Sequence, residues 1–229
     1  MIPYTSAIPK LECLDELLKY CDDWRMLLSP ASYPSINKSN EHLMLKHGYA
    51  IDNGIYADWV KDRDWDEDKF FMILDRYAAR ADWIVIPDAI GDWDKTVSLF
   101  MIWVNELFRY HRPLMIVAQD GAEQNDYREI RGLTKNGHRM IDGGIGVFIG
   151  GTTEWKLNNA GKIAKICRDN NALCHIGRVN SAKRVRMCWN WGATSFDGSG
   201  MSRFSLTARY VSSELLMLRT QEKQQLKLF

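Results

Sequence analysis

Three aspartates each follow directly on a short apolar run and stand inside a turn-forming sequence. They are Asp52 in Asp52-Asn53-Gly54, Asp88 in Pro87-Asp88-Ala89 and Asp197 in Phe196-Asp197-Gly198. Two carboxylates that face one site can divide a substitution at an anomeric carbon, because one attacks the carbon while the other moves protons at the leaving group. Aspartate suits the attack, since its carboxylate is charged at neutral pH and forms an ester that can be reversed. For any single one of these aspartates, the alternative to a catalytic role is a structural one, as a helix N-cap or in an Asx turn.

An amide, two glycines and a tyrosine stand at comparable places. Gln119 ends one apolar run, Gly150 and Gly151 follow another, and Tyr56 comes shortly after the first aspartate. A glutamine side chain carries a donor and an acceptor and can read the edge of a base. Glycines let backbone N–H groups approach a ligand closely. These residues predict a base-binding pocket, although a capping bond, a plain turn and ordinary packing explain each of them singly.

Alternating strand and helix patterns must hold these residues. Apolar runs typical of strands cover residues 2–8, 24–28, 49–51, 83–86, 114–118, 147–149, 173–176 and 193–196. Helical spacing of apolar residues covers 11–20, 66–80, 96–110, 127–136, 156–170, 181–191 and 207–227. Residues 29–40, rich in proline, serine and asparagine, form a loop in this interpretation. The alternation predicts an all-parallel sheet with helices outside it.

Seven or eight such strands predict a compact TIM-type (β/α)8 barrel. The chain of 229 residues suits a single domain over 1–229, with a C-terminal helix in the stretch 207–229. Residues that follow the strands of such a barrel meet at its C-terminal mouth, where loop residues perform the chemistry. A doubly wound open sheet is the alternative, and its ligand site also lies past the strand ends.

The composition is that of an ordinary globular protein, with 46% hydrophobic and 26% charged residues. No apolar run reaches the roughly 18 residues of a membrane span. Residues 1–10 lack the pattern of a signal peptide, so we expect a cytoplasmic protein. The five cysteines include no Cys-x-x-Cys pair, which argues against a zinc ribbon and a redox pair and favours reduced thiols.

Charge is distributed unevenly along the chain. Up to Asp126 there are 22 Asp and Glu against 13 Lys and Arg, and from Tyr127 onward there are 7 against 17. A basic C-terminal half is the footprint expected for a polyanion, because phosphate contacts supply most non-specific affinity for nucleic acids. The alternatives are that the two halves cancel in the fold and that these cations form a solvated helix face. The predicted contacts to a nucleic-acid backbone are Arg178, Lys183, Arg184, Arg186 and Arg203.

The order of the motifs resembles that of the tRNA-guanine transglycosylase superfamily. The matching runs are Asp-Asn-Gly at 52–54, Pro-Asp at 87–88, Gln-Asp-Gly at 119–121, Gly-Gly at 150–151, Gly-Arg-Val-Asn-Ser at 177–181 and Ser-Phe-Asp-Gly-Ser-Gly at 195–200. The chain looks most similar to the viral DpdA-like branch, whose members exchange guanine in DNA for a 7-deazaguanine of the preQ0 type. The resemblance implies a (β/α)8 barrel and base exchange without a cofactor.

The resemblance also implies roles for single residues. The acid at Asp197 is the nucleophile that attacks C1′ of the target nucleotide, and the acid at Asp52 is the general acid and base. Asp88 binds the donor edge of guanine, while Gln119 and the backbone of Gly150-Gly151 hold its carbonyl side. The expected partners are DNA and a free 7-deazaguanine base, and a target inside a duplex has to be flipped out of the stack.

The chain departs from the tRNA branch at one point. That branch carries a C-terminal zinc site of three cysteines and a histidine, whereas here no cysteine follows Cys188 and no histidine follows His175. We therefore expect no zinc subdomain and no metal, which favours DNA as the substrate. His175 is expected to be a packed or hydrogen-bonded residue at a strand end. Exchange in RNA, a water-consuming glycosylase and a catalytically inactive nucleic-acid-binding barrel stay as alternatives.

Overall fold

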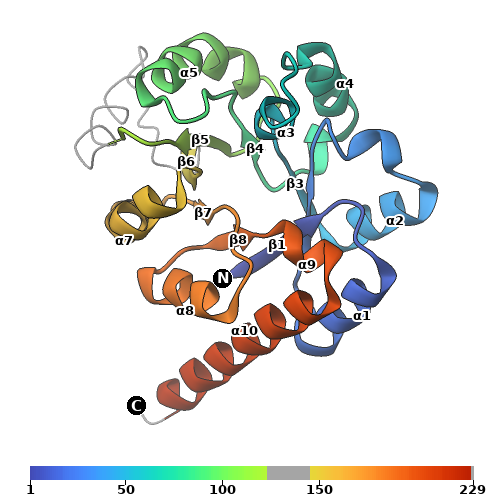
Figure 1. The fold of residues 1–229 in the computed structure, drawn as a ribbon, viewed down its shortest axis with the longest axis vertical. Coiled ribbons are helices and arrows are strands. Elements are labelled where there is room, and N and C mark those ends of the chain that lie inside the picture. The colour runs from blue at the N-terminus through green and yellow to red at the C-terminus, as the bar shows by residue number, and fades with distance from the viewer. Residues whose placement is uncertain (123–144, 228–229) are drawn as a thin grey trace.

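Eight parallel strands close into a barrel in a computed structural model, which describes residues 1–122 and 145–227 (Figure 1). Each strand pairs with the next one along the chain, and the last pairs with the first. The strands are β1 (Ile2–Ser6), β2 (Arg25–Leu28), β3 (Tyr49–Ile51), β4 (Ile84–Val85), β5 (Leu114–Ala118), β6 (Ile145–Ile149), β7 (Cys174–Ile176) and β8 (Ser195–Asp197). The predicted (β/α)8 barrel is confirmed, and the open-sheet alternative is wrong.

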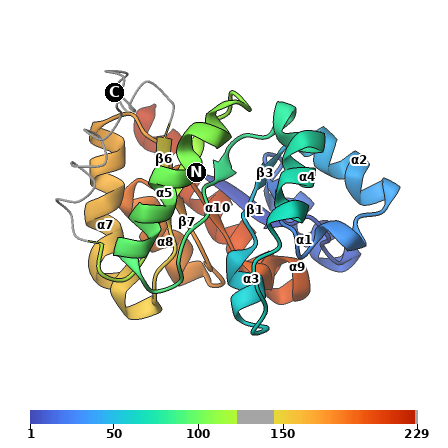
Figure 2. The same cartoon turned by 90° about the horizontal axis from the view of Figure 1, so that it is seen from above.

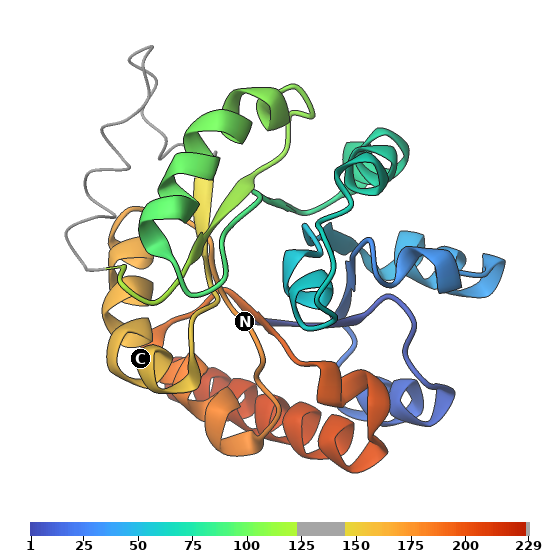
Figure 3. The same cartoon turned by 45° about the horizontal axis from the view of Figure 1, so that its top comes forward.

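Helices surround these strands on all sides (Figure 3). They are α1 (Leu11–Tyr20), α2 (Lys38–His47), α3 (Ile55–Trp59), α4 (Glu67–Tyr77), α5 (Trp93–Phe108), α7 (Thr153–Asp169), α8 (Ala182–Trp191), α9 (Ser199–Arg203) and α10 (Ser205–Leu226). Single 3-10 turns cover Tyr33–Ser35 and Ala78–Arg80. Within the described ranges, no helix is both long and apolar enough to cross a bilayer.

The structure differs from the sequence-based expectation in three places. Helix α2 begins at Lys38, inside the predicted loop, because the side chain of Asn37 accepts a hydrogen bond from the Asn40 N–H at 2.8 Å and caps it. The short helices α3 and α9 were not predicted. They follow the carboxyl ends of β3 and β8, and Figure 2 shows both on the same side of the molecule. The helix expected over 127–136 lies outside the described residues.

The core has two layers. The larger one fills the space between the barrel and its helices, and every residue of β5 is buried, as expected for a strand covered on both faces. The smaller one fills the interior of the barrel with Tyr4, Trp83, Met115 and their neighbours. The Tyr4 ring lies 5.2 Å from that of Trp83 between centroids, and its hydroxyl donates to Asp82 at 2.8 Å. Large side chains therefore fill the barrel interior. A ligand site can form at the C-terminal mouth above them.

The circular order of the strands turns the charge asymmetry of the sequence into a spatial one. The acidic half of the chain supplies β1 to β5 with α1 to α5, and the basic half supplies β6 to β8 with α7 to α10. In Figure 1 the first group lies along the upper and right sides, and the second along the lower left. The two halves thus form opposite sides of one barrel rather than interleaving.

The first helix, α1, packs against the last helix, α10, and substitutions on α1 can test this part of the fold. Leu17 on α1 is 1% exposed within the main core, whereas its neighbour Leu18 is 50% exposed. We predict that Leu17→Ala lowers the free energy of unfolding by about 2–5 kcal/mol, because it leaves a cavity. The matched Leu18→Ala should change that free energy by less than about 0.5 kcal/mol. Urea denaturation measures both, and equal losses would contradict this packing.

Candidate active site

A cavity of about 350 Å³ opens at the C-terminal mouth of the barrel. Every residue predicted to be catalytic or to bind a base lines it, together with one of the predicted cations. These residues are Asp52, Tyr56, Asp88, Gln119, Gly150, Gly151, Arg178 and Asp197. They come from loops or strand ends after β3, β4, β5, β6, β7 and β8, and they meet because all the strands run in the same direction.

Asp88 lies deep in the cavity and is 5% exposed. Its carboxylate accepts hydrogen bonds from Asn53 Nδ2 at 2.7 Å and from Gln119 Nε2 at 2.6 Å. Burial raises the pKa of Asp88 above its ordinary value, and the two amide hydrogen bonds act in the opposite direction. A carboxylate has about four lone-pair sites, so Asp88 retains acceptor capacity for a ligand with N–H donors.

Asn53 lines the cavity and was not predicted from the sequence to do so. Its side-chain amide donates both to Asp88 and to the Ile86 carbonyl at 2.9 Å, and its side-chain oxygen accepts from the Ile55 N–H at 2.9 Å. Asn53 therefore fixes the loop after β3 against the end of β4. Its position inside the Asp-Asn-Gly motif was the available signal, but an asparagine in a turn is ordinarily explained by local hydrogen bonds.

Asp52 has a pKa far from its ordinary value. Its carboxylate is partly buried and accepts one hydrogen bond from the Gly54 N–H at 3.2 Å. Burial, followed by the negative charges of Asp88 and Asp197, raises the pKa of Asp52 to about 7. A carboxyl group with a pKa near neutrality can both give and take a proton at physiological pH, which is the property of a general acid and base.

Asp197 is held by a histidine inside the barrel. Its Oδ1 lies 3.1 Å from His175 Nε2, and the other ring nitrogen of His175 lies 2.9 Å from Ser195 Oγ. The imidazole is fully buried, with the Phe148 ring 4.6 Å away between centroids. His175 is thus a packed, hydrogen-bonded residue, as the sequence predicts. It also orients a cavity carboxylate, which the sequence alone did not reveal.

The glycine after His175 is required by close packing. A Cβ atom on Gly177 would lie 2.8 Å from the Phe148 ring and 3.3 Å from Asp197 Oδ1. Any side chain there would push Phe148 or Asp197 from its place. The carbonyl of Gly177 accepts from Lys156 Nζ at 2.7 Å, and burial, followed by the charge of Arg178, lowers the pKa of this lysine to about 8. Lys156 does not itself line the cavity.

Arg178 connects two loops of the cavity wall. Its Nη2 donates to the Gly150 carbonyl at 2.8 Å and also to the Gly151 carbonyl. The guanidinium lies 5.2 Å from the centroid of the Tyr56 ring, within the range of a cation–π contact. Its backbone has a φ of 64°, a left-handed conformation that is uncommon outside glycine and that these contacts hold in place.

The backbone N–H groups of the two glycines after β6 do not point to a ligand as predicted. Both N–H groups donate to the Ala118 carbonyl, at 2.9 Å for Gly150 and 3.1 Å for Gly151, and are therefore already engaged. The glycines instead provide space, since a Cβ atom on Gly150 would lie 2.7 Å from Val117 Cγ1. Among the described residues, the remaining N–H groups of Arg178 and the second amide hydrogen of Gln119 have no hydrogen-bond acceptor, so they can serve as donors to a ligand carbonyl on this wall.

The other predicted cations lie outside the cavity. Arg184 on α8 donates to the Arg178 carbonyl at 3.1 Å, while Lys183 and Arg203 are exposed. Arg186 forms a two-pronged ion pair with Glu214 of α10, with Nε–Oε1 and Nη2–Oε2 distances of 2.7 and 3.1 Å. The structure thus engages Arg186 with another helix rather than leaving it free beside the mouth.

Metal ligands do not converge within the described parts of the chain, where no group of three or more His, Cys, Asp or Glu side chains could hold an ion. The five cysteines are all buried and unpaired.

Comparison with known proteins supports the fold alone. No protein-family model and no curated protein matches this sequence. A chain of the tryptophan synthase α2β2 complex of Pyrococcus furiosus superposes with a TM-score of 0.52 at 14% identity, covering 96% of this chain and 97% of that one. A chain of M. tuberculosis tryptophan synthase, in an aminoacrylate- and BRD0059-bound form, gives 0.54 at 10% identity, covering 94% and 90%. These similarities place the chain among (β/α)8 barrels, at identities too low to assign a reaction.

The titration of Asp52 predicts a dependence of stability on pH. The pKa in the folded chain, about 7, lies above the ordinary value of 3.8, so between these values the folded state binds more protons than the unfolded state. The stability contributed by Asp52 is therefore fully present below about pH 4 and is lost as pH rises to about 7. Because one unit of pKa difference corresponds to about 1.4 kcal/mol, we predict that Asp52→Asn gains up to roughly 4 kcal/mol of unfolding free energy, relative to the native chain, between pH 4 and pH 8.

Urea denaturation across that pH range measures this difference. The matched control is Asp62→Asn, which makes the same chemical change on an exposed aspartate outside the cavity. An Asp52→Asn curve that stays parallel to that of the native chain at every pH would contradict the assigned environment of Asp52.

Proposed function

We propose that this protein is a base-exchanging glycosyltransferase that replaces guanine in DNA by a 7-deazaguanine through a covalent Asp197–deoxyribose intermediate. The observation that carries the proposal is the meeting of Asp52, Asp88 and Asp197 in one cavity, each in a different environment. The order of motifs along the chain supports the same reaction. The similar solved structures support the barrel fold and give no information about the substrate.

The cavity has the features needed to recognise guanine. Guanine presents N–H donors at N1 and at its exocyclic amine, and an acceptor at O6. In our proposal the donors meet the free acceptor sites of Asp88, and the acceptor meets a donor from Gln119 or Arg178. Val117 and Phe148 supply apolar wall for the faces of the ring. The volume of about 350 Å³ falls within the range of small-ligand pockets, roughly 300–1,000 Å³.

The first chemical step is a displacement at C1′. A carboxylate oxygen of Asp197 attacks C1′ and forms a C–O bond while the bond from C1′ to N9 of guanine breaks. The electron pair of that bond stays on the base, and protonated Asp52 supplies the proton that makes the departing guanine neutral. Asp197 suits the attack because His175 holds one of its oxygens, which fixes its orientation.

The second step reverses the first with a different base. A 7-deazaguanine enters the vacated cavity and loses the proton on N9 to the Asp52 carboxylate, and its N9 attacks C1′. The ester bond to Asp197 breaks, and both aspartates return to their starting states. Neither water nor an oxidant or reductant is consumed. Two displacements at one carbon retain its configuration.

DNA is the proposed polymer because the order of motifs is most similar to that of the DNA-modifying branch, and the basic side of the barrel suits a polyanion. A base inside a duplex has to be extruded to reach the cavity, which costs a few kcal/mol. Cations along α8 and α9 can offset this cost through phosphate contacts, and salt screens such contacts. The proposed activity should therefore fall steeply as ionic strength rises.

Incorporation of a labelled base tests the proposal directly. The purified protein is mixed with guanine-containing duplex DNA and labelled 7-deazaguanine, as the cyano compound and related forms. We predict that label enters the DNA and that guanine is released in equal amount. Abasic sites in place of label would instead favour a glycosylase, and label entering only tRNA would favour the RNA branch. Absence of any release or incorporation by a folded sample would overturn the proposal.

Substitution of the proposed nucleophile separates chemistry from binding. We predict that Asp197→Asn lowers exchange by at least about a thousandfold, because an amide cannot form the ester, while DNA binding stays within a few-fold. Asp169→Asn on the exposed surface of α7 is the matched control and should retain activity. Exchange rates and a gel-shift titration measure the two properties. Undiminished exchange by Asp197→Asn would assign the attack to another residue.

A further inference from the structure

The loop after β7 separates the base cavity from a small second cavity between α7 and α8, with a volume of about 30 Å³. Gly177 and Arg178 line both cavities, whereas Lys156 and Arg184 line the small one and not the base cavity. The peptide that joins Gly177 to Arg178 therefore forms a wall whose two sides face different spaces.

Two cations hold the carbonyl groups of this wall from the side of the small cavity. The Gly177 carbonyl accepts from Lys156 Nζ at 2.7 Å, and the Arg178 carbonyl accepts from Arg184 Nη1 at 3.1 Å. Lys156 is 7% exposed, and in the described structure no carboxylate forms an ion pair with it. A buried ammonium without a paired carboxylate is costly, which argues that its bond to Gly177 has a role beyond packing.

The other edge of the same peptide faces the base cavity. The C=O and N–H groups of a trans peptide point in opposite directions, so a Gly177 carbonyl directed at Lys156 turns the Arg178 N–H toward the base. The preceding and following N–H groups, those of Gly177 and Val179, donate to backbone carbonyls of β6 and β8 at 3.1 and 2.6 Å. The Arg178 N–H has no acceptor among the described residues, so it is available to a ligand.

The order of the strands decides which edge of a base meets this N–H. In the proposed pose, Asp88 after β4 binds N1–H and the exocyclic amine of guanine, and Gln119 after β5 meets O6. Around a purine, position 7 follows O6 and precedes N9. Around the barrel, β6 and β7 follow β5 and precede β8, which carries Asp197. The N–H groups of the two glycines after β6 are already engaged, so the Arg178 N–H is placed to meet position 7.

We infer that the backbone N–H of Arg178 donates a hydrogen bond to N7 of the target guanine, and that Lys156 is a positioning residue that holds this peptide in the required orientation. The inference rests on the proposed function. Guanine has an acceptor at N7, whereas a 7-deazaguanine has a carbon atom at that place. The bond can therefore form with the base that leaves, and that ring position of the base that enters cannot form it.

A hydrogen bond at N7 also assists the departure of guanine. When the bond from C1′ to N9 breaks, its electron pair enters the ring system of the base, and a fixed donor at N7 stabilises the charge that develops there. The proton stays on the nitrogen of Arg178, and no covalent bond is made or broken at N7. The modified nucleotide lacks N7, so the expulsion of its base does not receive this help.

Two nucleosides that differ only at position 7 test the inference, namely 2′-deoxyguanosine and 7-deaza-2′-deoxyguanosine. Isothermal titration calorimetry measures the dissociation constant of each. In the native protein we expect the constant of the 7-deaza probe to be at least about tenfold higher, because the donor loses its acceptor. In Lys156→Met, which removes the bond to Gly177, this ratio should fall below about threefold. Arg184→Met removes the bond to the next carbonyl and should also lower the ratio, so the test survives if Lys156→Met fails to fold.

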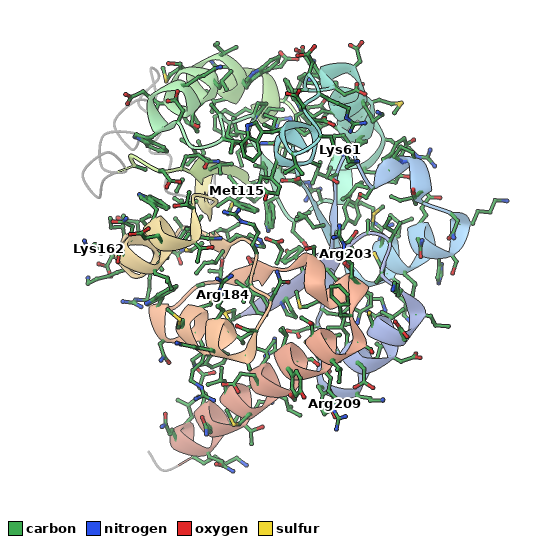
Figure 4. The ribbon with its side chains drawn as sticks, in the orientation of Figure 1. Lys61, Met115, Lys162, Arg184, Arg203 and Arg209 are labelled. Atoms are coloured by element: carbon green, nitrogen blue, oxygen red, sulfur yellow. The ribbon has the colours of Figure 1, made fainter. Side chains whose placement is uncertain are left out.

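Two further variants act as controls. Arg178→Gly removes the guanidinium but keeps the backbone N–H, in a left-handed conformation with a φ of 64° that glycine adopts readily. It should weaken binding of both probes and keep their ratio, which separates the backbone donor from the side chain. Lys162→Met makes the same chemical change as Lys156→Met on the outer side of α7, where Lys162 is exposed (Figure 4). It should leave both constants within about twofold of the native values.

Each other outcome has a distinct meaning. A native ratio near one, with both probes bound, would overturn the bond to N7 and leave the proposed function standing. An unchanged ratio in folded Lys156→Met, or in Arg184→Met where Lys156→Met does not fold, would overturn the role of the held peptide. Loss of the ratio in Arg178→Gly would assign position 7 to the guanidinium and overturn the inference as well. Failure of the native protein to bind either probe would overturn the proposed function and this inference with it.

Discussion

Three carboxylates share one partly buried space at the mouth of this barrel, and burial together with the charges of its two neighbours governs the titration of Asp52. Burial disfavours the charged forms of Asp52 and Asp88, and the charges of Asp88 and Asp197 further raise the cost of ionising Asp52. An open or shifted sheet would relieve that repulsion by moving the side chains apart. The closed ring of parallel strands prevents this, since each aspartate lies at or just past a strand that is paired on both sides. The fold thereby brings a carboxyl group to a pKa of about 7.

The three aspartates are chemically identical and differ only in their surroundings. Two side-chain amides hold Asp88 deep in the cavity, an imidazole holds one oxygen of Asp197, and the backbone N–H of Gly54 donates to Asp52. In the proposed reaction these surroundings correspond to three tasks, namely recognition, attack and proton transfer.

Much of this arrangement was predictable from the sequence, because parallel strands that alternate with helices bring all their carboxyl ends to one face. That rule alone gathered Asp52, Asp88, Gln119 and Asp197 into one cavity. The contacts that refine the site were not predictable, since they join residues far apart in the chain. The bond between His175 and Asp197 and the ion pair between Arg186 and Glu214 depend on tertiary pairing. Helices α3 and α9 span five residues each, too few for a periodic pattern to appear.

The covalent intermediate is the most direct measure of the central claim. The protein is incubated with guanine-containing duplex DNA in the absence of an incoming base, quenched with denaturant, digested and mapped by mass spectrometry. The account predicts a deoxyribosyl ester on the peptide that contains Asp197, which disappears when a 7-deazaguanine is added before the quench. Exchange that proceeds with the adduct on Asp52, or with no adduct on any aspartate, would contradict it.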